Sequence, residues 1–556
     1  MQKKLTPNQK SLILFIGFLA IYLLPGIYGH TPWKQDENYS FGIIQTMFET
    51  GNWLVPTNAG EPFMEKPPLY YWVATISAHL LSGFMPLYDA ARSATLLFSV
   101  INFSFFILLA RRAFNTDHIS DKRIWIAFAL YLCAPGILRH SHDMFTDVAL
   151  ITGATIGLYG ILGLIRQEKV AMSALWLMFG TVITMLSKGV FIPGVLWLSL
   201  LLAPIFLPHC RQKLFWLPAI IAGLAALILI LPWPILLYRQ HPDLFMTWFW
   251  ENNIGRFLGF SVEKLGAKAN LTRVPASVLL FALPAGILAT LYFIRNPLKR
   301  LRSRNEYLVT IFPLLGIVFL QISATGRALY LLPFIAPLAI LGTQTVLALP
   351  EKVLRGFSCF AATLWSLLII FLWVCYFIAL SGQTQVWLTP FSKWLPMSYQ
   401  MPFSIVALLV ATILTAIWFL RRALLSRQIT LRAMQNWTLG MCIVWGITFS
   451  LFLGWIDYTK GFKDVFVDLE QHLKGHYHAN DCMASDNIGE SEAPMLYYYT
   501  KILHQRQDRF EKPEQCRWLI VLSKQIKPAP AGMTLFWSNH RPDEFTENLV
   551  VYKSIE

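Results

Sequence analysis

The chain contains about thirteen apolar runs, each long enough to cross a lipid bilayer as a helix. A water-soluble fold could not bury so much apolar surface, because 55% of the residues are hydrophobic and only 14% are charged. The sequence therefore predicts an all-α polytopic membrane protein. The runs lie near residues 11–29, 90–110, 124–138, 144–165, 171–187, 189–207, 214–237, 276–294, 306–322, 328–349, 356–381, 402–420 and 436–457.

Basic residues alternate from loop to loop between these runs. With the N-terminus in the cytoplasm, every second loop carries Lys or Arg, as the positive-inside rule requires. This pattern explains the net charge of +15 without a nucleic-acid partner. It also places the tail, from about residue 458, on the outer face. The basic loops contain Arg111, Arg112, Lys122, Arg123, Arg166, Lys169, Arg211, Lys213, Arg295, Lys299, Arg300, Arg302, Arg304, Lys352, Arg355, Arg421, Arg422, Arg427 and Arg432.

The tail, residues 458–556, differs in composition from the rest of the chain. It mixes charged residues with short apolar runs and has turn signals at 528–532, which indicates a small soluble α/β domain. Cys482 and Cys516 share this region, and they either form a disulfide in an oxidising compartment or remain unpaired. The seven cysteines show no CxxC and no Cys/His ligand spacing, so a structural zinc site is not expected.

Two adjacent acids, Asp36 and Glu37, follow the first apolar run at the membrane surface. Residues 39–47 carry apolar side chains at helical spacing, as in a helix lying in the membrane interface. A helix N-terminus favours anions, so one interpretation is that both acids cap this helix. The other is catalysis, because capping does not require two adjacent acids. A second apolar stretch of this outer loop, 69–84, is short and is predicted to be re-entrant or interfacial.

Glu65 and Lys66 precede a doubled proline that fixes the local backbone. They form either an exposed ion pair of little energetic value or a phosphate-binding lysine that an acid holds in place.

Asp143 and Asp147 stand four residues apart at the outer start of the fourth run, on one helix face. Ionisable groups at this depth are costly and indicate function. The alternatives are a helix start balanced by neighbouring basic side chains, or a metal site that also uses His140 and His142.

Four cations lie on the outer face, against the positive-inside trend: Lys66, Lys188, Arg256 and Arg327. Each alone could be an interfacial residue with its head group in water. Together they predict a bound anion, and a lipid phosphate or pyrophosphate is the expected one.

The sequence contains no GxxxxGK[ST] motif and no GxGxxG motif after a strand. A nucleotide donor from the cytoplasm is therefore not expected, and a lipid-borne donor fits better. A lipid transporter is the alternative from another class. It would require paired halves with polar residues near mid-bilayer, and the sequence shows no such halves.

The segments DENYSFGIIQTMFETGNWLVP and FMEKPPLYYW resemble the first outer loop of the bacterial aminoarabinose lipid A transferases. That family belongs with the protein O-mannosyltransferases to the GT-C membrane glycosyltransferases. LSKG, Arg256 and YLLP continue the match in order. The resemblance implies a transmembrane glycosyltransferase domain over 1–457, with periplasmic loops at 30–88 and 239–275. It implies a periplasmic domain over 458–556.

The activity that the resemblance implies is an inverting sugar transfer at the periplasmic face of the bacterial inner membrane. The donor would be a polyprenyl-phosphate sugar, 4-amino-4-deoxy-L-arabinose or another amino sugar, and the acceptor lipid A or another periplasmic molecule. A protein O-glycosyltransferase and an O-antigen-modifying transferase are the alternatives within the enzyme class. No cofactor is required, although a divalent metal is compatible with the acids.

The resemblance maps the family's acids to Asp36, with Glu37 beside it, and to Asp143 or alternatively Asp147. Together with the outer-face cations, it assigns catalysis to Asp36, Glu37 and Asp143, and donor phosphate binding to Lys66, Arg256, Lys188 and Arg327. Supporting roles fall to Glu65, Asp147, Arg92 and Tyr39. The chain departs from the family at two of the phosphate contacts. Tyr39 stands where the family often has Arg, and Gly326 and Arg327 replace a usual Ser-Lys.

Overall fold

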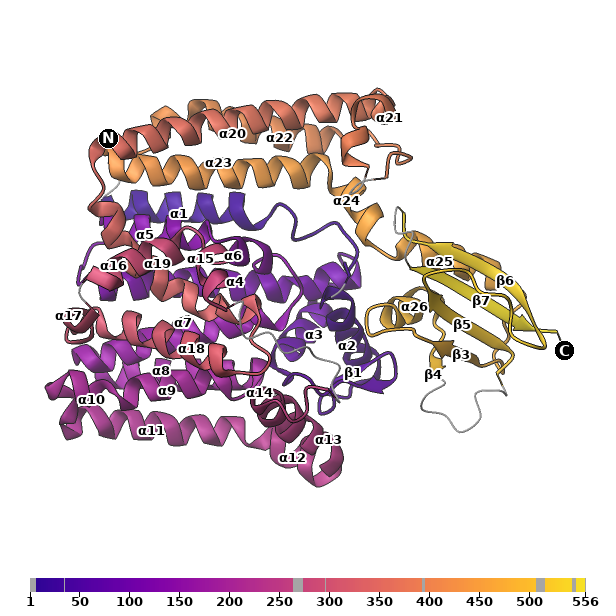
Figure 1. Cartoon of the computed structure of the whole chain (residues 1–556), viewed down its shortest axis with the longest axis horizontal. Helices are drawn as coiled ribbons and strands as arrows, with labels where there is room; N and C mark the ends of the chain where they lie inside the picture. Colours follow the sequence, from indigo (N-terminus) through magenta and orange to yellow (C-terminus); the bar gives the residue numbers. More distant parts are fainter. Residues whose placement is uncertain are drawn as a thin grey trace.

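The computed structural model describes residues 7–34, 36–263, 274–295, 297–392, 396–506, 516–542 and 547–555. It consists of a body of long, roughly parallel helices and a smaller domain with a β-sheet at one end of them (Figure 1). This arrangement confirms the predicted class, a polytopic helical membrane protein with a small C-terminal α/β domain.

Each predicted apolar run corresponds to one helix or to a pair of helices. Several pairs meet at a proline, which cannot continue the helical hydrogen-bond ladder. Among the described residues, seven helices are long and apolar enough to cross a membrane, or eight if the bent pair α23–α24 counts as one span. The number of thirteen membrane-spanning helices therefore stays a prediction. The helices are α1 (Pro7–Leu23), α4 (Leu87–Ala113), α5 (Lys122–Leu132), α6 (Pro135–His140), α7 (Thr146–Arg166), α8 (Val170–Lys188), α9 (Phe191–Leu201), α10 (Ala203–Phe206), α11 (Lys213–Ile230), α12 (Pro232–Gln240), α15 (Val274–Leu280), α16 (Ala285–Arg295), α18 (Tyr307–Ile322), α19 (Leu332–Leu347), α20 (Glu351–Leu380), α22 (Ile405–Leu424), α23 (Ile429–Leu451) and α24 (Leu453–Lys460).

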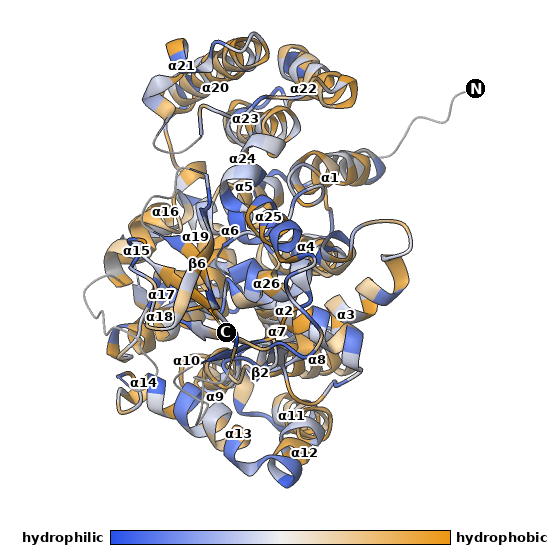
Figure 2. Cartoon of the chain, turned by 90° about the vertical axis from the view of Figure 1, so that its right-hand side faces the viewer, coloured by the Kyte–Doolittle hydropathy of each residue, from blue (hydrophilic) through white to orange (hydrophobic). Residues whose placement is uncertain are grey.

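The centre of the body is α7, which is buried along almost its whole length between α4, α8 and α19. Glycines permit its close approach to α8, because a Cβ atom on Gly180 would lie only 2.4 Å from the Cα of Gly157. Helices α20, α22 and α23 form a separate layer beside α1 (Figure 1). The outward faces of α11, α20 and α22 are hydrophobic, as expected for helices in lipid (Figure 2).

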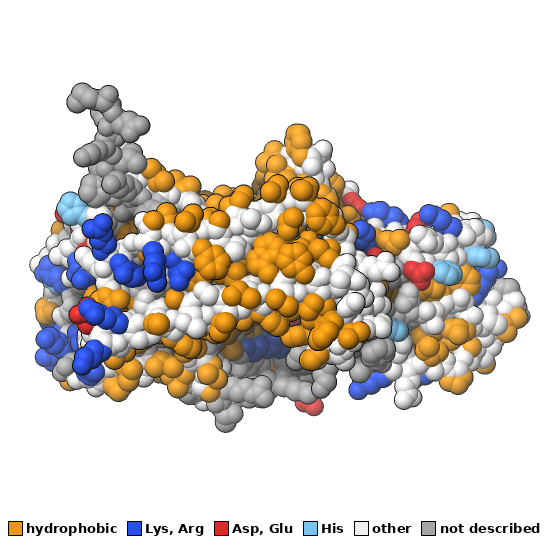
Figure 3. Space-filling view, turned by 90° about the horizontal axis from the view of Figure 1, so that it is seen from above, with side chains coloured by type: hydrophobic (Ala, Val, Ile, Leu, Met, Phe, Trp, Pro, Cys, Tyr) orange, Lys and Arg blue, Asp and Glu red, His pale blue; other side chains and the backbone are white. Residues whose placement is uncertain are grey.

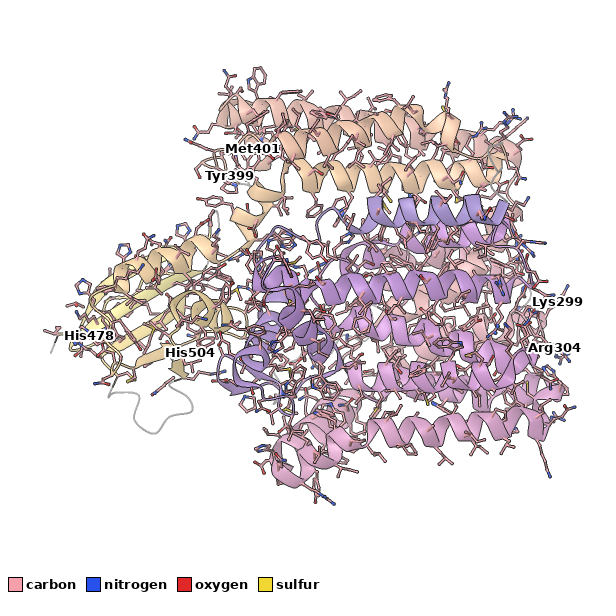
Figure 4. All side chains as sticks on the ribbon, turned by 180° about the vertical axis from the view of Figure 1, so that it is seen from behind. Lys299, Arg304, Tyr399, Met401, His478 and His504 are labelled. Atoms are coloured by element: carbon pink, nitrogen blue, oxygen red, sulfur yellow. A yellow bond between two sulfur atoms is a disulfide. The ribbon has the colours of Figure 1, made fainter. Side chains whose placement is uncertain are left out.

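The two ends of the helical body differ in charge. Lys and Arg side chains gather at the end that lies away from the sheet domain (Figure 3). Lys299 and Arg304 lie at this end, opposite to His478 and His504 of the sheet domain (Figure 4). The arrangement agrees with the orientation that the basic loops predict, with the C-terminal domain on the outer face.

The first outer loop folds into α2 (Asp36–Thr50), a hairpin of β1 (Thr57–Asn58) and β2 (Glu61–Pro62), and α3 (Leu69–Leu81). The predicted helix over 39–47 is present as part of α2, and its position in the membrane interface stays a prediction. Helix α2 is buried on nearly all sides from Glu37 to Met47, because α3, α4 and the C-terminal domain all pack on it.

The C-terminal domain has a five-stranded mixed sheet of order β4-β3-β5-β7-β6. Strand β3 pairs in parallel with β4 and β5, and β7 pairs antiparallel with β5 and β6. A disulfide joins Cys482 and Cys516, just before the adjacent strands β3 and β5. The elements are α25 (Lys463–Leu473), β3 (Met483–Asp486), α26 (Ala493–Thr500), β4 (His504–Arg506), β5 (Trp518–Ser523), β6 (Met533–His540) and β7 (Asn548–Ser554).

Short helical segments connect the longer helices. The outer connection after α12 contains a nine-residue π-helix, a rare form that is frequent at functional sites. These segments are η1 (Pro208–Arg211), α13 (Pro242–Met246), the π-helix η2 (Thr247–Gly255), α14 (Arg256–Leu258), α17 (Pro297–Leu301), η3 (Ala328–Leu331), α21 (Thr384–Trp387) and η4 (Thr389–Phe391).

Candidate active site

A cavity of about 810 Å³ opens at the end of the helical body that faces the C-terminal domain. Its walls come from α2, the loop before α3, the facing ends of α7, α8, α9 and α18, the η2–α14 segment, η3 and one loop of the C-terminal domain. Seven of the residues that the sequence predicts for the site line this cavity: Asp36, Tyr39, Glu65, Lys66, Lys188, Arg256 and Arg327.

A chain of hydrogen bonds joins the first predicted acid to the first predicted cation. The Tyr39 hydroxyl donates to the Asp36 carboxylate at 3.3 Å and accepts a short hydrogen bond from the Lys66 ammonium. Burial, together with the nearby Asp36 carboxyl, raises the pKa of Tyr39 well above its usual value. The phenol therefore stays protonated and can make both contacts. Tyr39 fills the position where the related family often has Arg, and it couples the acid to the lysine.

Two ammonium groups share one aromatic ring. Lys66 Nζ lies 4.3 Å and Lys188 Nζ 5.6 Å from the centre of the Phe145 ring. Burial, and then the charge of Lys188, lower the pKa of Lys66. Lys66 has no carboxylate ion pair among the described residues. Two neighbouring cations with largely buried side chains favour a bound anion, because an anion would offset both desolvation and mutual repulsion.

Lys188 is fixed in place at the end of α8. Its ammonium lies 2.5 Å from Asp147, which is fully buried in the first turn of α7. Gly189 ends the helix with a φ of 89°, and a side chain there would collide with Asn253 of η2. The structure thus explains the lysine and the glycine of the LSKG motif. Its lysine faces the cavity, and its glycine lets the chain turn against η2.

The η2–α14 segment brings Arg256 to the cavity. Arg256 pairs with Glu65 at 3.5 Å, and the Asn252 side chain donates to the Met64 carbonyl at 3.3 Å. These contacts connect two loops that are far apart in sequence. The Glu65–Lys66 pair therefore does not act as an isolated surface ion pair, because each member has a different partner.

Glu37 does not line the cavity, although the sequence groups it with Asp36. Its carboxylate accepts hydrogen bonds from the backbone amides of Trp33 and Met144, at 3.0 and 2.8 Å, and from Arg92 Nε at 3.1 Å. Arg92 is fully buried and also binds Asp89 at 2.7 Å. Glu37 and Arg92 thus tie the first outer loop to α4. The predicted catalytic role of Glu37 stays a prediction, and its contacts favour a positioning role.

The buried cluster of Glu37, Arg92 and Asp89 leads to a prediction about stability. Arg92→Met should lower the free energy of unfolding by about 3–5 kcal/mol, because Glu37 and Asp89 would lose their shared buried cation. Adding Glu37→Gln should recover part of the loss. Thermal unfolding in detergent checks both variants. As a control, Arg355→Met breaks an exposed pair with Glu351 and should cost under about 0.5 kcal/mol. Equal destabilisation by Arg92→Met and Arg355→Met would contradict the cluster's structural role.

Asp143 also lies outside the cavity wall. Arg139 donates to it at 3.1 Å, and His140 lies 3.8 Å away. Burial and the Glu37 charge raise the pKa of Asp143 to about 7. The metal interpretation gains no support. Both ring nitrogens of His142 bond to backbone carbonyls, and no group of three or more potential ligand side chains occurs in the described part of the chain.

Some cavity residues carry no sequence signal of their own. Asn252 and Asn253 project from η2, whereas Tyr330, which packs against Lys188, belongs to the YLLP segment. Glu490 belongs to the C-terminal domain, more than four hundred residues after Asp36, and nothing in the sequence connects the two.

Together, the helical body, the cavity at one end of it and the appended sheet domain form a fold of the GT-C type. Solved structures of ArnT have a similar fold. The crystal structure of ArnT from Cupriavidus metallidurans bound to undecaprenyl phosphate superposes with a TM-score of 0.69 over 97% of both chains, at 16% sequence identity. The resemblance to the aminoarabinose transferases is thus confirmed at the level of fold.

Curated relatives match over part of their length. An undecaprenyl phosphate-alpha-4-amino-4-deoxy-L-arabinose arabinosyl transferase of Pseudomonas fluorescens is 26% identical over 343 residues, 60% of this chain and 57% of that protein. The corresponding transferase of an Enterobacter species is 25% identical over 362 residues, 60% of this chain and 58% of that protein. The matched region therefore spans less than two thirds of these relatives. No family model matches the chain.

Proposed function

We propose that the chain transfers an amino sugar of the 4-amino-4-deoxy-L-arabinose type from undecaprenyl phosphate to lipid A. The observation that carries this proposal is the placement of Asp36 and four cations in one outer-face cavity. The four cations can bind a lipid phosphate. The similar transferases are named for undecaprenyl phosphate, and the ArnT crystal structure has undecaprenyl phosphate bound.

A second groove gives the donor lipid a place to lie. It has a volume of about 960 Å³, is lined almost entirely by apolar side chains of α8, α9, α11, α12 and η2, and shares Val190 and Gly194 with the cavity. An isoprenoid chain in this groove would lead its phosphate to Lys66 and Lys188.

The proposed reaction is a single displacement with inversion. An acceptor oxygen attacks the anomeric carbon, and the bond from that carbon to the phosphate oxygen breaks. Asp36 takes the proton from the acceptor or orients it. Lys66, Lys188, Arg256 and Arg327 stabilise the charge that develops on the departing undecaprenyl phosphate. Asp147 and Glu65 hold Lys188 and Arg256 in place, and no step requires a metal.

We further propose that the reaction takes place on the periplasmic face of the bacterial inner membrane. Two features support this side. The basic loops gather at the opposite end of the helices (Figure 3). The Cys482–Cys516 disulfide is typical of an oxidising compartment.

Mass spectrometry of lipid A tests the function. A Gram-negative host that lacks its own aminoarabinose transferase should gain lipid A carrying the extra sugar when this chain is expressed, and should not gain it with Asp36→Asn. If lipid A stays unmodified while a protein or the O-antigen is newly glycosylated, then that molecule, and not lipid A, is the acceptor. The absence of any new glycoconjugate would favour lipid transport.

A further inference from the structure

One loop of the C-terminal domain, residues 487–492, reaches over the first outer loop to the cavity. The Asn58 side chain donates to the Glu490 carbonyl at 2.9 Å, and the Asn38 side chain donates to the Ser491 hydroxyl at 3.1 Å. Glu492, the next residue, pairs with Lys34 at 3.1 Å. The backbone of this loop is therefore fixed to α2 and the β1–β2 hairpin.

The fixed backbone directs the Glu490 side chain into the cavity, where solvent reaches it. Three acids in the described part of the chain line the cavity. Asp36 accepts a hydrogen bond from Tyr39, and Glu65 pairs with Arg256. The Glu490 carboxyl forms no hydrogen bond and no ion pair with any residue in the described ranges. Glu490 is thus the cavity acid that is open to a ligand.

The surroundings of Glu490 are unfavourable for its negative charge. Burial by the cavity walls, and then the charge of Glu65, raise the pKa of Glu490 to about 7. Asp36 and Glu492 act in the same direction. The charge of Lys66 lowers the pKa of Glu490 in part, but the Lys66 ammonium donates its hydrogen bond to Tyr39 and not to Glu490. A second cation beside Glu490 would relieve this repulsion.

We propose that Glu490 binds the protonated amino group of the donor sugar, so that the C-terminal domain selects amino sugars over neutral ones. This inference rests on the proposed function. The cationic wall attracts the donor phosphate but repels an ammonium group on the same sugar. An amino-sugar donor therefore needs a free carboxylate in the cavity, and Glu490 supplies it.

The test compares two donors on the purified full-length chain. One is undecaprenyl phosphate carrying 4-amino-4-deoxy-L-arabinose, and the other carries L-arabinose, with a hydroxyl in place of the amine. Wild type should prefer the amino donor in kcat/KM by about tenfold to a hundredfold, the range of a hydrogen bond between charged groups. Glu490→Gln should lose this preference through slower transfer from the amino donor alone. Glu490→Ser serves if the first variant does not fold.

The pH dependence supplies a second readout that a structural role would not change. The wild-type preference should rise between about pH 6 and about pH 8, as Glu490 ionises, and the preference of Glu490→Gln should stay flat. Asp36, Tyr39, Glu65, Lys66, Tyr71 and Glu492 also face Glu490. Glu490→Gln retains all of them, so a pH dependence that they cause would persist in that variant.

Glu61→Gln is the matched control. Glu61 bridges the same two parts of the molecule through Arg506, at 3.6 Å, but does not line the cavity, so its variant should keep the preference. Transfer of neither donor by wild type would overturn the proposed function itself. Transfer of both donors with a preference unchanged in Glu490→Gln, or with no preference in wild type, would overturn only the role of Glu490.

Discussion

Replacing Asp36 with Asn is expected to lower sugar transfer by more than about 100-fold while the protein remains folded and still binds undecaprenyl phosphate. The Asp36 side chain lies at the first turn of α2, is partly exposed to the cavity and touches Tyr39. An amide of the same shape can still accept the Tyr39 hydrogen bond, but it cannot take a proton from the acceptor. The measurement is single-turnover transfer with purified protein, alongside thermal unfolding and a donor-binding titration.

A second aspartate provides the control for helix capping. Asp243 stands in the first turn of α13 on the same face of the membrane, is exposed and does not line the cavity. Asp243→Asn should leave transfer unchanged. Near-normal turnover in purified Asp36→Asn would reduce Asp36 to a helix cap. Asp143, whose pKa lies near neutrality, would then become the candidate base.

The sequence predicts the helical body and four of the cavity cations for the same physical reason. Charge in a membrane protein follows strong rules, so a lysine such as Lys188 on the wrong face stands out. The sequence also brings Glu65 and Lys66 to the site, because the doubled proline after them restricts the loop. In each case the signal is local.

The roles of Asp36 and Glu37 could not be separated from sequence. Adjacent residues on a helix point about 100° apart, because one turn contains about 3.6 residues. Which of the two acids faces the cavity therefore depends on how α2 rotates against α4, and the buried Arg92 fixes that rotation by binding Glu37.

The contribution of the C-terminal domain to the cavity could not be predicted from the sequence either. A soluble domain packed on α2 buries a helix that the pattern alone assigns to the membrane interface. The same packing brings Glu490 beside Glu65 and Lys66. Such contacts depend on how two parts of the chain dock, and no spacing within either part encodes them.

Lys66→Gln and Arg256→Gln are each expected to weaken undecaprenyl phosphate binding by about tenfold to over a hundredfold, because a hydrogen bond to a charged group is worth about 1.5–3 kcal/mol. Both residues line the cavity: Lys66 is buried, and Arg256 pairs with Glu65, the residue before Lys66. Lys188 is less suitable for this test, since its removal would leave the fully buried Asp147 without its cation.

The double variant decides whether the two cations bind one phosphate. If they do, the loss in Lys66→Gln/Arg256→Gln should differ from the product of the two single losses, because the sites share a ligand. Lys501→Gln is the control, since Lys501 is an exposed cation on the same face that pairs with Glu49 away from the cavity. Its affinity should equal that of wild type. Unchanged affinity in both folded single variants would instead make Lys66 and Arg256 interfacial residues whose stems lie along apolar surface. The lipid-phosphate donor would then lose its main support.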